Sequence, residues 1–437
     1  MEASILPMQI DGQWIKDEQG RTLLLRGVNL GGSSKLPTTP DGRTFNRERF
    51  YDHRSVSFVG RPFPLSAADA HFARLRAWGM TFVRFLVTWE AVEHAGPGVY
   101  DRDYLDYLRA VISKAAEHDI ACYIDPHQDV WSRWTGGDGA PGWTLEAIGF
   151  DLTQLDTTGA AITHAGHGDP FPRMIWPTNY AKLGAATMFA LFYAGDDLAP
   201  HTRINGEPAQ AYLQRHYIAA MQQVALALKG LPNVVGYGAM NEPVASLLGL
   251  ADVRQLPTRN LIMTGAMPNF WQAIQLGVGY AQPVGVYQMG FSGPEQLDTV
   301  TLNPDGKRVW RDGYPCVWQQ NGVWEPDADG QPQLLRPDYF AQVNGRTPDF
   351  ANDYLKPFIV RYIQALREVD PHTILFVEGV PGGEHPHWGA GDPPNIVNAA
   401  HWYDALTLFM KTFNPEFTVD FNTQLPIMGA DAVAQST

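Results

Sequence analysis

The feature that most constrains the fold is a regular alternation of strand and helix patterns along the chain. Short apolar or β-branched runs, typical of buried strands, fall at residues 23–30, 81–87, 120–124, 234–240, 373–377 and 395–400. Helix patterns fall at residues 67–78, 104–118, 211–229 and 351–369. Strands that alternate with helices are joined by crossovers and form a parallel sheet. The order of the elements therefore predicts an α/β fold.

Two α/β architectures satisfy this order, the open doubly wound sheet and the closed barrel. No glycine-rich phosphate loop follows the first strand, so a nucleotide-binding sheet has little support. Polar and aromatic residues instead gather directly after the strands, where a barrel builds its active site. We therefore expect a TIM (β/α)8-type barrel that is incomplete, because only six of the eight strands can be found.

A single barrel domain is expected over residues 1–437, since no internal repeat or low-complexity run divides the chain. Two long insertions, at about 125–208 and 244–347, interrupt the alternation. The first is rich in Gly, Pro and Trp and is expected to form irregular walls of a cleft. In the second, the turns Asp305-Gly306 and Asp329-Gly330 predict hairpins.

Composition limits the partners and the compartment. The formal net charge of −14 argues against a surface that binds nucleic acid or anionic lipid headgroups. No run of about 18 apolar residues occurs, so no membrane span is predicted. The first residues lack the basic and apolar regions of a secretory signal, and we expect a cytoplasmic protein. Cys122 lies within a strand pattern and is expected to be a buried free thiol.

The tripeptide Asn241-Glu242-Pro243 ends the fourth strand. A carboxyl group at this place, between an asparagine and a rigid proline, can point into the mouth of a barrel. Cleavage of a glycosidic bond needs such a carboxylic acid to protonate the leaving oxygen. The same tripeptide is common in ordinary turns, so its place at the end of a strand is what favours catalysis.

Other strand ends carry further candidates. His127 and Asp129, after the third strand, are suited to bind sugar hydroxyls; a metal site is the alternative, and no second His or Cys lies at a useful spacing for it. Arg84, within the second strand, needs an anionic partner if it is buried, either a catalytic carboxylate or a structural one. His401 and Tyr403 follow the sixth strand and share one face, which places the tyrosine hydroxyl to touch a nucleophilic carboxylate; the alternative is a packing tyrosine with a surface histidine.

Glu378 closes the fifth strand and is the obvious candidate for a second carboxylate in the chain. In a barrel the fifth strand is adjacent to the fourth, so this side chain would approach Glu242 from the side and not from across the mouth. We therefore expect Glu378 either to tune the pocket around Glu242 or to face away from it.

These strand ends resemble glycoside hydrolase family 5, and the similarity spans nearly the whole chain. Residues 25–30 (LRGVNL) are similar to the first strand of the family, residues 241–243 (NEP) to its acid/base strand and residues 401–403 (HWY) to its sixth strand. Longer stretches are similar to the endoglycoceramidase-related branch, which includes glucosylceramidases and steryl β-glucosidases; they are residues 57–64, 125–133 and 174–180.

The resemblance implies a retaining β-glucosidase that acts on glycolipid-type β-glucosides, either glucosylceramide or a steryl glucoside, with Glu242 as the acid/base. It implies contacts with the substrate for Lys35, His127, Asp129 and Asn241, and Tyr403 matches the sixth-strand tyrosine of the family. The partner would be a small-molecule glycoside or glycolipid, which apolar loops could reach by peripheral contact with lipid. No cofactor and no metal are expected.

The chain departs from the family pattern at its end. The nucleophile of the family is a glutamate that ends the seventh strand, and the short tail after Tyr403 contains no such motif. We therefore expect the seventh and eighth strands, and the β-sandwich that often follows them in this branch, to be absent. The alternative function is a catalytically inactive fragment or a sugar-binding protein that lacks the nucleophile.

Overall fold

A six-stranded parallel sheet forms the centre of the computed structural model, which describes residues 8–256, 263–290, 293–381, 383–404, 407–408, 411–419 and 425–432. Every neighbouring pair of its strands is parallel. The strands lie in their order along the chain: β3 (Gly27–Leu30), β4 (Phe82–Thr88), β5 (Ala121–His127), β8 (Val234–Gly238), β14 (Ile374–Val377) and β15 (Ile396–Asn398). This order is that of a (β/α)8 barrel, and the expected fold class is confirmed.

Burial explains how the central strands could be recognised. β4 and β5 are buried along nearly their whole length, and strands buried on both faces have continuous apolar sequences. Two glycines allow their neighbours to approach closely. A Cβ atom on Gly27 would lie 1.3 Å from the carbonyl oxygen of Phe82, and one on Gly236 would lie 2.1 Å from that of Ile374. Any larger residue at either position would therefore push neighbouring strands apart.

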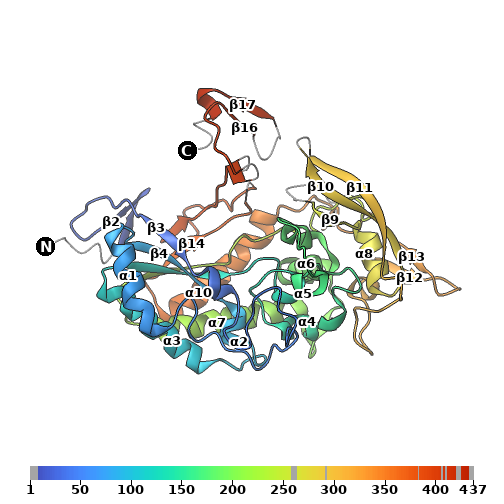
Figure 1. Cartoon of the computed structure of the whole chain (residues 1–437), viewed down its shortest axis with the longest axis horizontal. Coiled ribbons are helices and arrows are strands. Elements are labelled where there is room, and N and C mark those ends of the chain that lie inside the picture. Colours follow the sequence, from blue (N-terminus) through green and yellow to red (C-terminus); the bar gives the residue numbers. More distant parts are fainter. Residues whose placement is uncertain are drawn as a thin grey trace.

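The four expected helices are present within a few residues of their predicted bounds: α1 (Ala68–Ala77), α3 (Arg102–Glu117), α7 (Ala209–Leu228) and α10 (Lys356–Val369). Figure 1 shows α1, α3 and α7 along one side of the molecule, beneath the sheet. α3 begins where the Asp101 carboxylate accepts a hydrogen bond from the Tyr104 amide. Pro357 lies in the first turn of α10, which tolerates proline, and a π-helical turn (Phe350–Leu355) precedes it.

The first insertion is not the irregular wall that we expected. It contains α4 (Gly142–Ala147), α5 (His164–His167) and a long helix, α6 (Leu183–Leu198). α6 is buried on nearly every side. Its sequence therefore lacks the alternation of an apolar face and a polar face by which a surface helix is recognised.

The second insertion carries a long antiparallel hairpin of β10 (Gln282–Gly290) and β11 (Gly293–Leu302). The hairpin predicted at Asp329-Gly330 is confirmed, because β12 (Trp324–Pro326) and β13 (Pro332–Leu334) flank it as an antiparallel pair. The one predicted at Asp305-Gly306 is wrong. That dipeptide closes a turn in which the Gly306 amide donates to Asn303, after β11 has already paired with β10.

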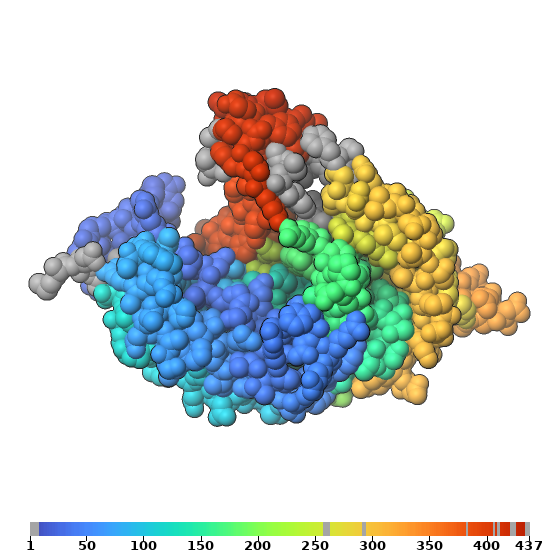
Figure 2. All heavy atoms as spheres, in the orientation of Figure 1, coloured from blue at the N-terminus to red at the C-terminus, as the bar shows by residue number. Residues whose placement is uncertain are grey.

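The remaining strands and α-helices are short. They comprise β1 (Gln9–Asp11), β2 (Trp14–Lys16), α2 (Trp89–Glu93), β6 (Arg203–Ile204), β7 (Glu207–Pro208), β9 (Gly265–Ala266), α8 (Phe270–Gly277), α9 (Val317–Gln320), β16 (Phe417–Val419) and β17 (Pro426–Met428). The β10–β11 hairpin and the β16–β17 pair rise from the same side of the molecule (Figures 1 and 2). Cys122 is a buried free thiol, as expected. No described helix combines the length and apolar character that crossing a bilayer requires.

Candidate active site

The candidate residues lie at the carboxyl ends of the parallel strands. His127 ends β5, Glu242 follows β8, Glu378 follows β14 and His401 follows β15. Lys35 ends the short 3-10 helix Gly32–Lys35, directly after β3. Because the carboxyl ends of parallel strands meet at one edge of a sheet, residues far apart in the sequence come together here.

Glu242 is held from both its side chain and its backbone. Its Oε1 lies 2.7 Å from His401 Nδ1 and accepts a hydrogen bond from the Tyr403 hydroxyl at 3.3 Å. Its backbone amide donates to Glu378 Oε2 at 3.1 Å, and its carbonyl accepts from Gln128 Nε2 at 3.2 Å. Among the described residues both side-chain contacts fall on Oε1, which leaves Oε2 for a substrate. The backbone has a φ of +41°, and such strain in a non-glycine residue is typical of functional sites.

Arg84 joins the neighbours of Glu242 into one network. Its Nη2 lies 2.6 Å from Asn241 Oδ1, 2.8 Å from Glu378 Oε1 and 2.9 Å from Asp125 Oδ2. Burial opposes the charge of Arg84, but Asp125 and Glu378 raise its pKa above the ordinary value. The described ion-pair partners of Arg84 are thus Asp125 and Glu378, which neighbour the catalytic candidate, and they correspond to the structural ion pair.

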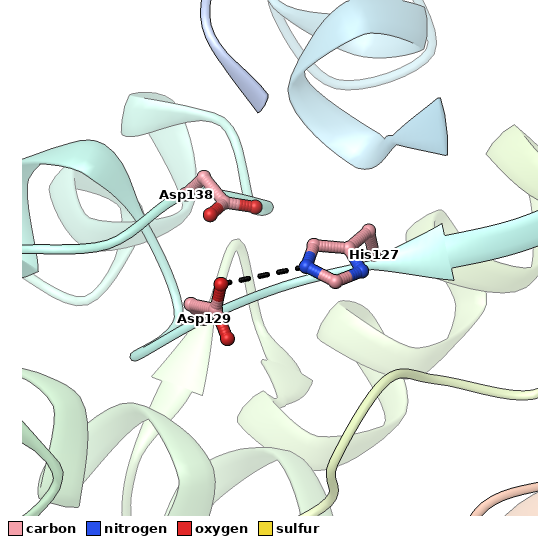
Figure 3. A group of neighbouring side chains, drawn as sticks. All are labelled: His127, Asp129 and Asp138. Carbon is pink, nitrogen blue, oxygen red and sulfur yellow. Dashed lines mark hydrogen bonds and ion pairs between the residues drawn. The ribbon is translucent and has the colours of Figure 1, made fainter. Parts of the chain in front are cut away.

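His127 lies between two carboxylates. Its Nδ1 is 2.8 Å from Asp125 Oδ2 and its Nε2 is 3.4 Å from Asp129 Oδ2. Burial alone would lower the pKa of His127, but Asp125 and Asp129 raise it to about 10. The Asp129 carboxylate also forms an ion pair with Lys35, whose ammonium lies 3.6 Å from Asp138. The His127 ring, Asp129 and Asp138 face one another across a loop (Figure 3).

The same three residues have the composition of a metal site, since their ligand atoms lie within 4.8 Å of one another. The chemistry does not fit a metal ion. Metal ligation requires a neutral imidazole, whereas Asp125 and Asp129 raise the pKa of His127 to about 10 and so favour the protonated ring. The Lys35 ammonium contacts both Asp129 and Asp138 and already supplies a positive charge there. Donors and acceptors arranged side by side are instead suited to sugar hydroxyls.

The structure brings together every site residue that the sequence singled out: Lys35, Arg84, His127, Asp129, Asn241, Glu242, His401 and Tyr403. The Tyr403 hydroxyl donates to Glu242 at 3.3 Å, and its side chain is exposed and not packed in the core. Glu378 follows the first of its two expected outcomes, because it lies beside Glu242.

Sequence reasoning assigned no role to Asp125, Gln128 or Asp138. Asp125 could have been found, because it lies two residues before His127 and so on the same face of β5. Gln128 lies inside the same motif, but its contacts with the carbonyl groups of Asn241 and Glu242 depend on the pairing of β5 with β8. Asp138 pairs with Asp129 in an isolated bridge, for which the sequence contains no signal.

Comparisons with known proteins agree in the kind of protein that this chain resembles. The family model for cellulase (glycosyl hydrolase family 5) matches residues 41–161. A glucosylceramidase of Rhizopus delemar is 43% identical over 426 residues, which cover 95% of this chain and 62% of the relative. An ergosteryl-beta-glucosidase of Saccharomyces cerevisiae is 34% identical over 465 residues, which cover 94% of this chain and 59% of the relative.

A solved structure extends the likeness to three dimensions. The crystal structure of Cryptococcus neoformans sterylglucosidase 1 superposes with a TM-score of 0.90 at 33% identity, covering 98% of this chain and 65% of that one. The chain thus spans less than two thirds of the length of each of these relatives.

Proposed function

We propose that this chain, which belongs to glycosyl hydrolase family 5, carries the acid/base of a retaining β-glucosidase that acts on glycolipid-type β-glucosides. The relatives that are similar along most of the chain are named glucosylceramidase and ergosteryl-beta-glucosidase, which supports a ceramide or sterol as the aglycone. The proposal concerns a single barrel domain over residues 1–437 and, as the sequence suggested, a cytoplasmic protein.

The observation that carries the proposal is the way Glu242 is presented. Its backbone is fixed by Glu378 and Gln128, and His401 and Tyr403 hold one carboxylate oxygen. In a retaining mechanism a nucleophilic carboxylate bonds to the anomeric carbon while the protonated acid/base gives its proton to the glycosidic oxygen and the aglycone leaves. The resulting acid/base carboxylate then takes a proton from the water that breaks the bond between the sugar and the nucleophile. Among the described residues only the acid/base is assigned. A group with this double role needs a fixed position and one accessible oxygen.

Recognition of the glucose hydroxyls is assigned to the cluster of Lys35, His127 and Asp129. The Asp129 carboxylate lies between the other two side chains and contacts both the Lys35 ammonium and the His127 ring. A hydroxyl group both donates and accepts hydrogen bonds, so an anion flanked by cationic donors can bind adjacent hydroxyls on one sugar edge.

Contact with the lipid part of the substrate is assigned to exposed apolar side chains, one beside the candidate site and four on segments at the same side of the molecule. Trp402 is 55% exposed between His401 and Tyr403, both of which contact Glu242. Other exposed apolar residues lie on the segments that rise from the same side of the molecule (Figure 2): Leu297, Phe413, Leu425 and Met428. We name these five residues the apolar rim. With a net charge of −14, the apolar rim is suited to neutral glycolipid surfaces and not to anionic ones.

The proposal is tested by incubating the protein with glucosylceramide and with ergosteryl β-glucoside, and with galactosylceramide as the matched control. Where a nucleophile is supplied, we expect release of glucose from the first two, with β-glucose as the first product in an NMR time course because the mechanism retains configuration. For residues 1–437 alone, in which the sequence predicts no nucleophile, we expect negligible turnover. Release of α-glucose first would contradict the retaining mechanism. Hydrolysis that persists unchanged in Glu242→Gln would contradict the role of Glu242.

A further inference from the structure

Glu378 is a buried carboxylate whose two oxygens are both engaged. It is 2% exposed, and Oε1 accepts a hydrogen bond from Arg84 Nη2 at 2.8 Å. Oε2 accepts from the backbone amide of Glu242 at 3.1 Å and lies 3.3 Å from His401 Nε2. An attacking carboxylate must present an oxygen to the anomeric carbon, and these contacts cover both oxygens of Glu378.

We propose that Glu378 is a positioning residue, which holds the backbone of Glu242 in its strained turn and keeps His401 as an imidazolium between two carboxylates. The inference rests on the proposed function in one respect, since it takes Glu242 as the acid/base of the site. It assigns Glu378 a role that acts through its neighbours and not on the sugar.

The first part of this role is mechanical. A non-glycine residue with a positive φ is strained and persists only where its surroundings fix it. Glu242 is such a residue, with a φ of +41°. Glu378, next to β14, accepts its amide, and Gln128, next to β5, donates to its carbonyl. The turn of Glu242 is thus clamped by the two strands that flank β8.

The second part is electrostatic and concerns His401. Its Nδ1 faces Glu242 at 2.7 Å and its Nε2 faces Glu378 at 3.3 Å. A neutral imidazole has only one N–H donor, so with both carboxylates ionised the two contacts are both hydrogen bonds only when the ring is protonated. When Glu242 carries the proton as the acid, its O–H can donate to Nδ1 and a neutral ring can donate from Nε2 to Glu378. Burial lowers the pKa of His401 and the nearby Arg84 opposes its charge, but the two carboxylates raise the pKa to about 9.

Glu378 also completes a chain of groups of alternating charge that crosses the candidate site. Each successive pair is in contact, and the order is Lys35, Asp129, His127, Asp125, Arg84, Glu378, His401 and Glu242. Loss of the charge on Glu378 would leave Arg84 and His401, two cations, without the carboxylate that separates them. Both effects would be felt at Glu242.

The experiment compares Glu378→Gln with Glu384→Gln, an exposed glutamate a few residues away. The pKa of His401 is measured by NMR on protein with ¹³C-labelled histidine, and kcat and KM are measured across pH on an aryl β-glucoside. In Glu378→Gln we expect the His401 pKa to move down from about 9 toward the ordinary value, and the pH profile of kcat to change with it. We expect kcat to fall roughly 100-fold with KM nearly unchanged, because the acid/base is displaced and not the sugar. Glu384→Gln should match the parent protein.

A purely structural role would lower the amount of folded protein without moving either pH readout, and would overturn the proposal. So would a His401 pKa at or below 6.5 in the parent protein, a result that needs no variant to fold. Covalent trapping of a 2-fluoro-glucosyl group on Glu378, located by peptide mass spectrometry, would make it the nucleophile and also overturn it. If the parent protein cleaves no glucoside, that result matches the absence of a nucleophile among residues 1–437 and counts against activity of this chain, while the NMR readout alone still decides the role of Glu378.

Discussion

Lys35 shows at the residue scale how a charge defines what the site can bind. Its ammonium contacts Asp129 and Asp138, and these carboxylates raise its pKa although burial opposes the charge. Burial raises the pKa of Asp138 to about 7, whereas His127 and Lys35 hold that of Asp129 below its ordinary value despite burial. Lys35 therefore keeps one acceptor, Asp129, ionised for a sugar hydroxyl.

We predict that Lys35→Met weakens the binding of isofagomine, a glucose-shaped iminosugar, by roughly 10- to 100-fold. The loss of one charged hydrogen bond is worth about 1.5–3 kcal/mol, and 1.4 kcal/mol is tenfold in affinity. Calorimetric titration measures the change, and Lys114→Met, which removes a lysine from an ion pair on the surface helix α3, is the control. Equal affinities for Lys35→Met and the parent protein would show that the cluster does not bind the sugar.

Single elements of the fold also depend on a buried ion pair outside the network of contacts around Glu242. Arg133, in the 3-10 helix Arg133–Thr135, contacts Glu90 of α2 with Nε at 2.9 Å and Nη2 at 2.6 Å, and both side chains are buried. Removal of one partner from such a pair leaves the other charge without compensation. The pair therefore couples α2 to the loop that follows β5.

We predict that Arg133→Met lowers the free energy of unfolding by about 3–5 kcal/mol, as measured by urea denaturation. The double variant Arg133→Met with Glu90→Gln should recover part of this loss, because the remaining charge is also removed. The exposed pair Arg215–Glu207 provides the control, since Arg215→Met should cost less than about 1 kcal/mol. Equal losses for the two arginine variants would contradict the importance of burial.

A second element, α4, is fixed by contacts of the Glu146 carboxylate with two basic residues, and the stability that these contacts give depends on pH. The Glu146 carboxylate accepts from His53 and Arg54, and these contacts lower its pKa to about 2. A depressed pKa contributes stability above the ordinary value near 4.5, and this stability is lost as the pH falls toward 2. We predict that Glu146→Gln costs roughly 1 kcal/mol at pH 7 and clearly less at pH 3, in thermal unfolding. A cost that is independent of pH would contradict this assignment.

Whether a helix or strand can be predicted from the sequence depends on which of its faces are exposed to solvent. The strands β4 and β5 and the half-exposed helices α3 and α10 have one-sided or continuous apolar patterns and were predicted. The helix α6 has no polar face and was missed. The strand ends placed Glu242 and His401 correctly, whereas Asp138 depends on the folding of a loop back onto Asp129 and gave no local signal.

At the scale of the whole molecule, we assign contact with lipid to one end of the sheet, at the carboxyl ends of its strands. Trp402 follows the carboxyl end of β15 and belongs to the apolar rim, whereas Trp78 precedes the amino end of β4. Both are well exposed, at 55% and 66% respectively. They are therefore a matched pair for testing which end of the sheet meets lipid.

We predict that Trp402→Ser reduces binding to phosphatidylcholine vesicles that contain glucosylceramide, and that Trp78→Ser leaves it unchanged. The loss should be several-fold, because burial of a large apolar side chain contributes about 1.5–3 kcal/mol. Vesicle flotation measures the bound fraction, and addition of phosphatidylserine should weaken it because the protein is acidic. Equal losses for the two variants would contradict a lipid contact at the apolar rim.

The central claim, that Glu242 is the acid/base, is tested most directly by the dependence of hydrolysis on the leaving group. Glu242→Gln keeps the size of the side chain but cannot protonate the leaving oxygen. We predict a loss of about 10²- to 10⁴-fold on an alkyl β-glucoside, which needs that proton, and little loss in the first step on 2,4-dinitrophenyl β-glucoside, which does not. Equal losses on the two substrates, or no loss on either, would contradict the assignment of Glu242.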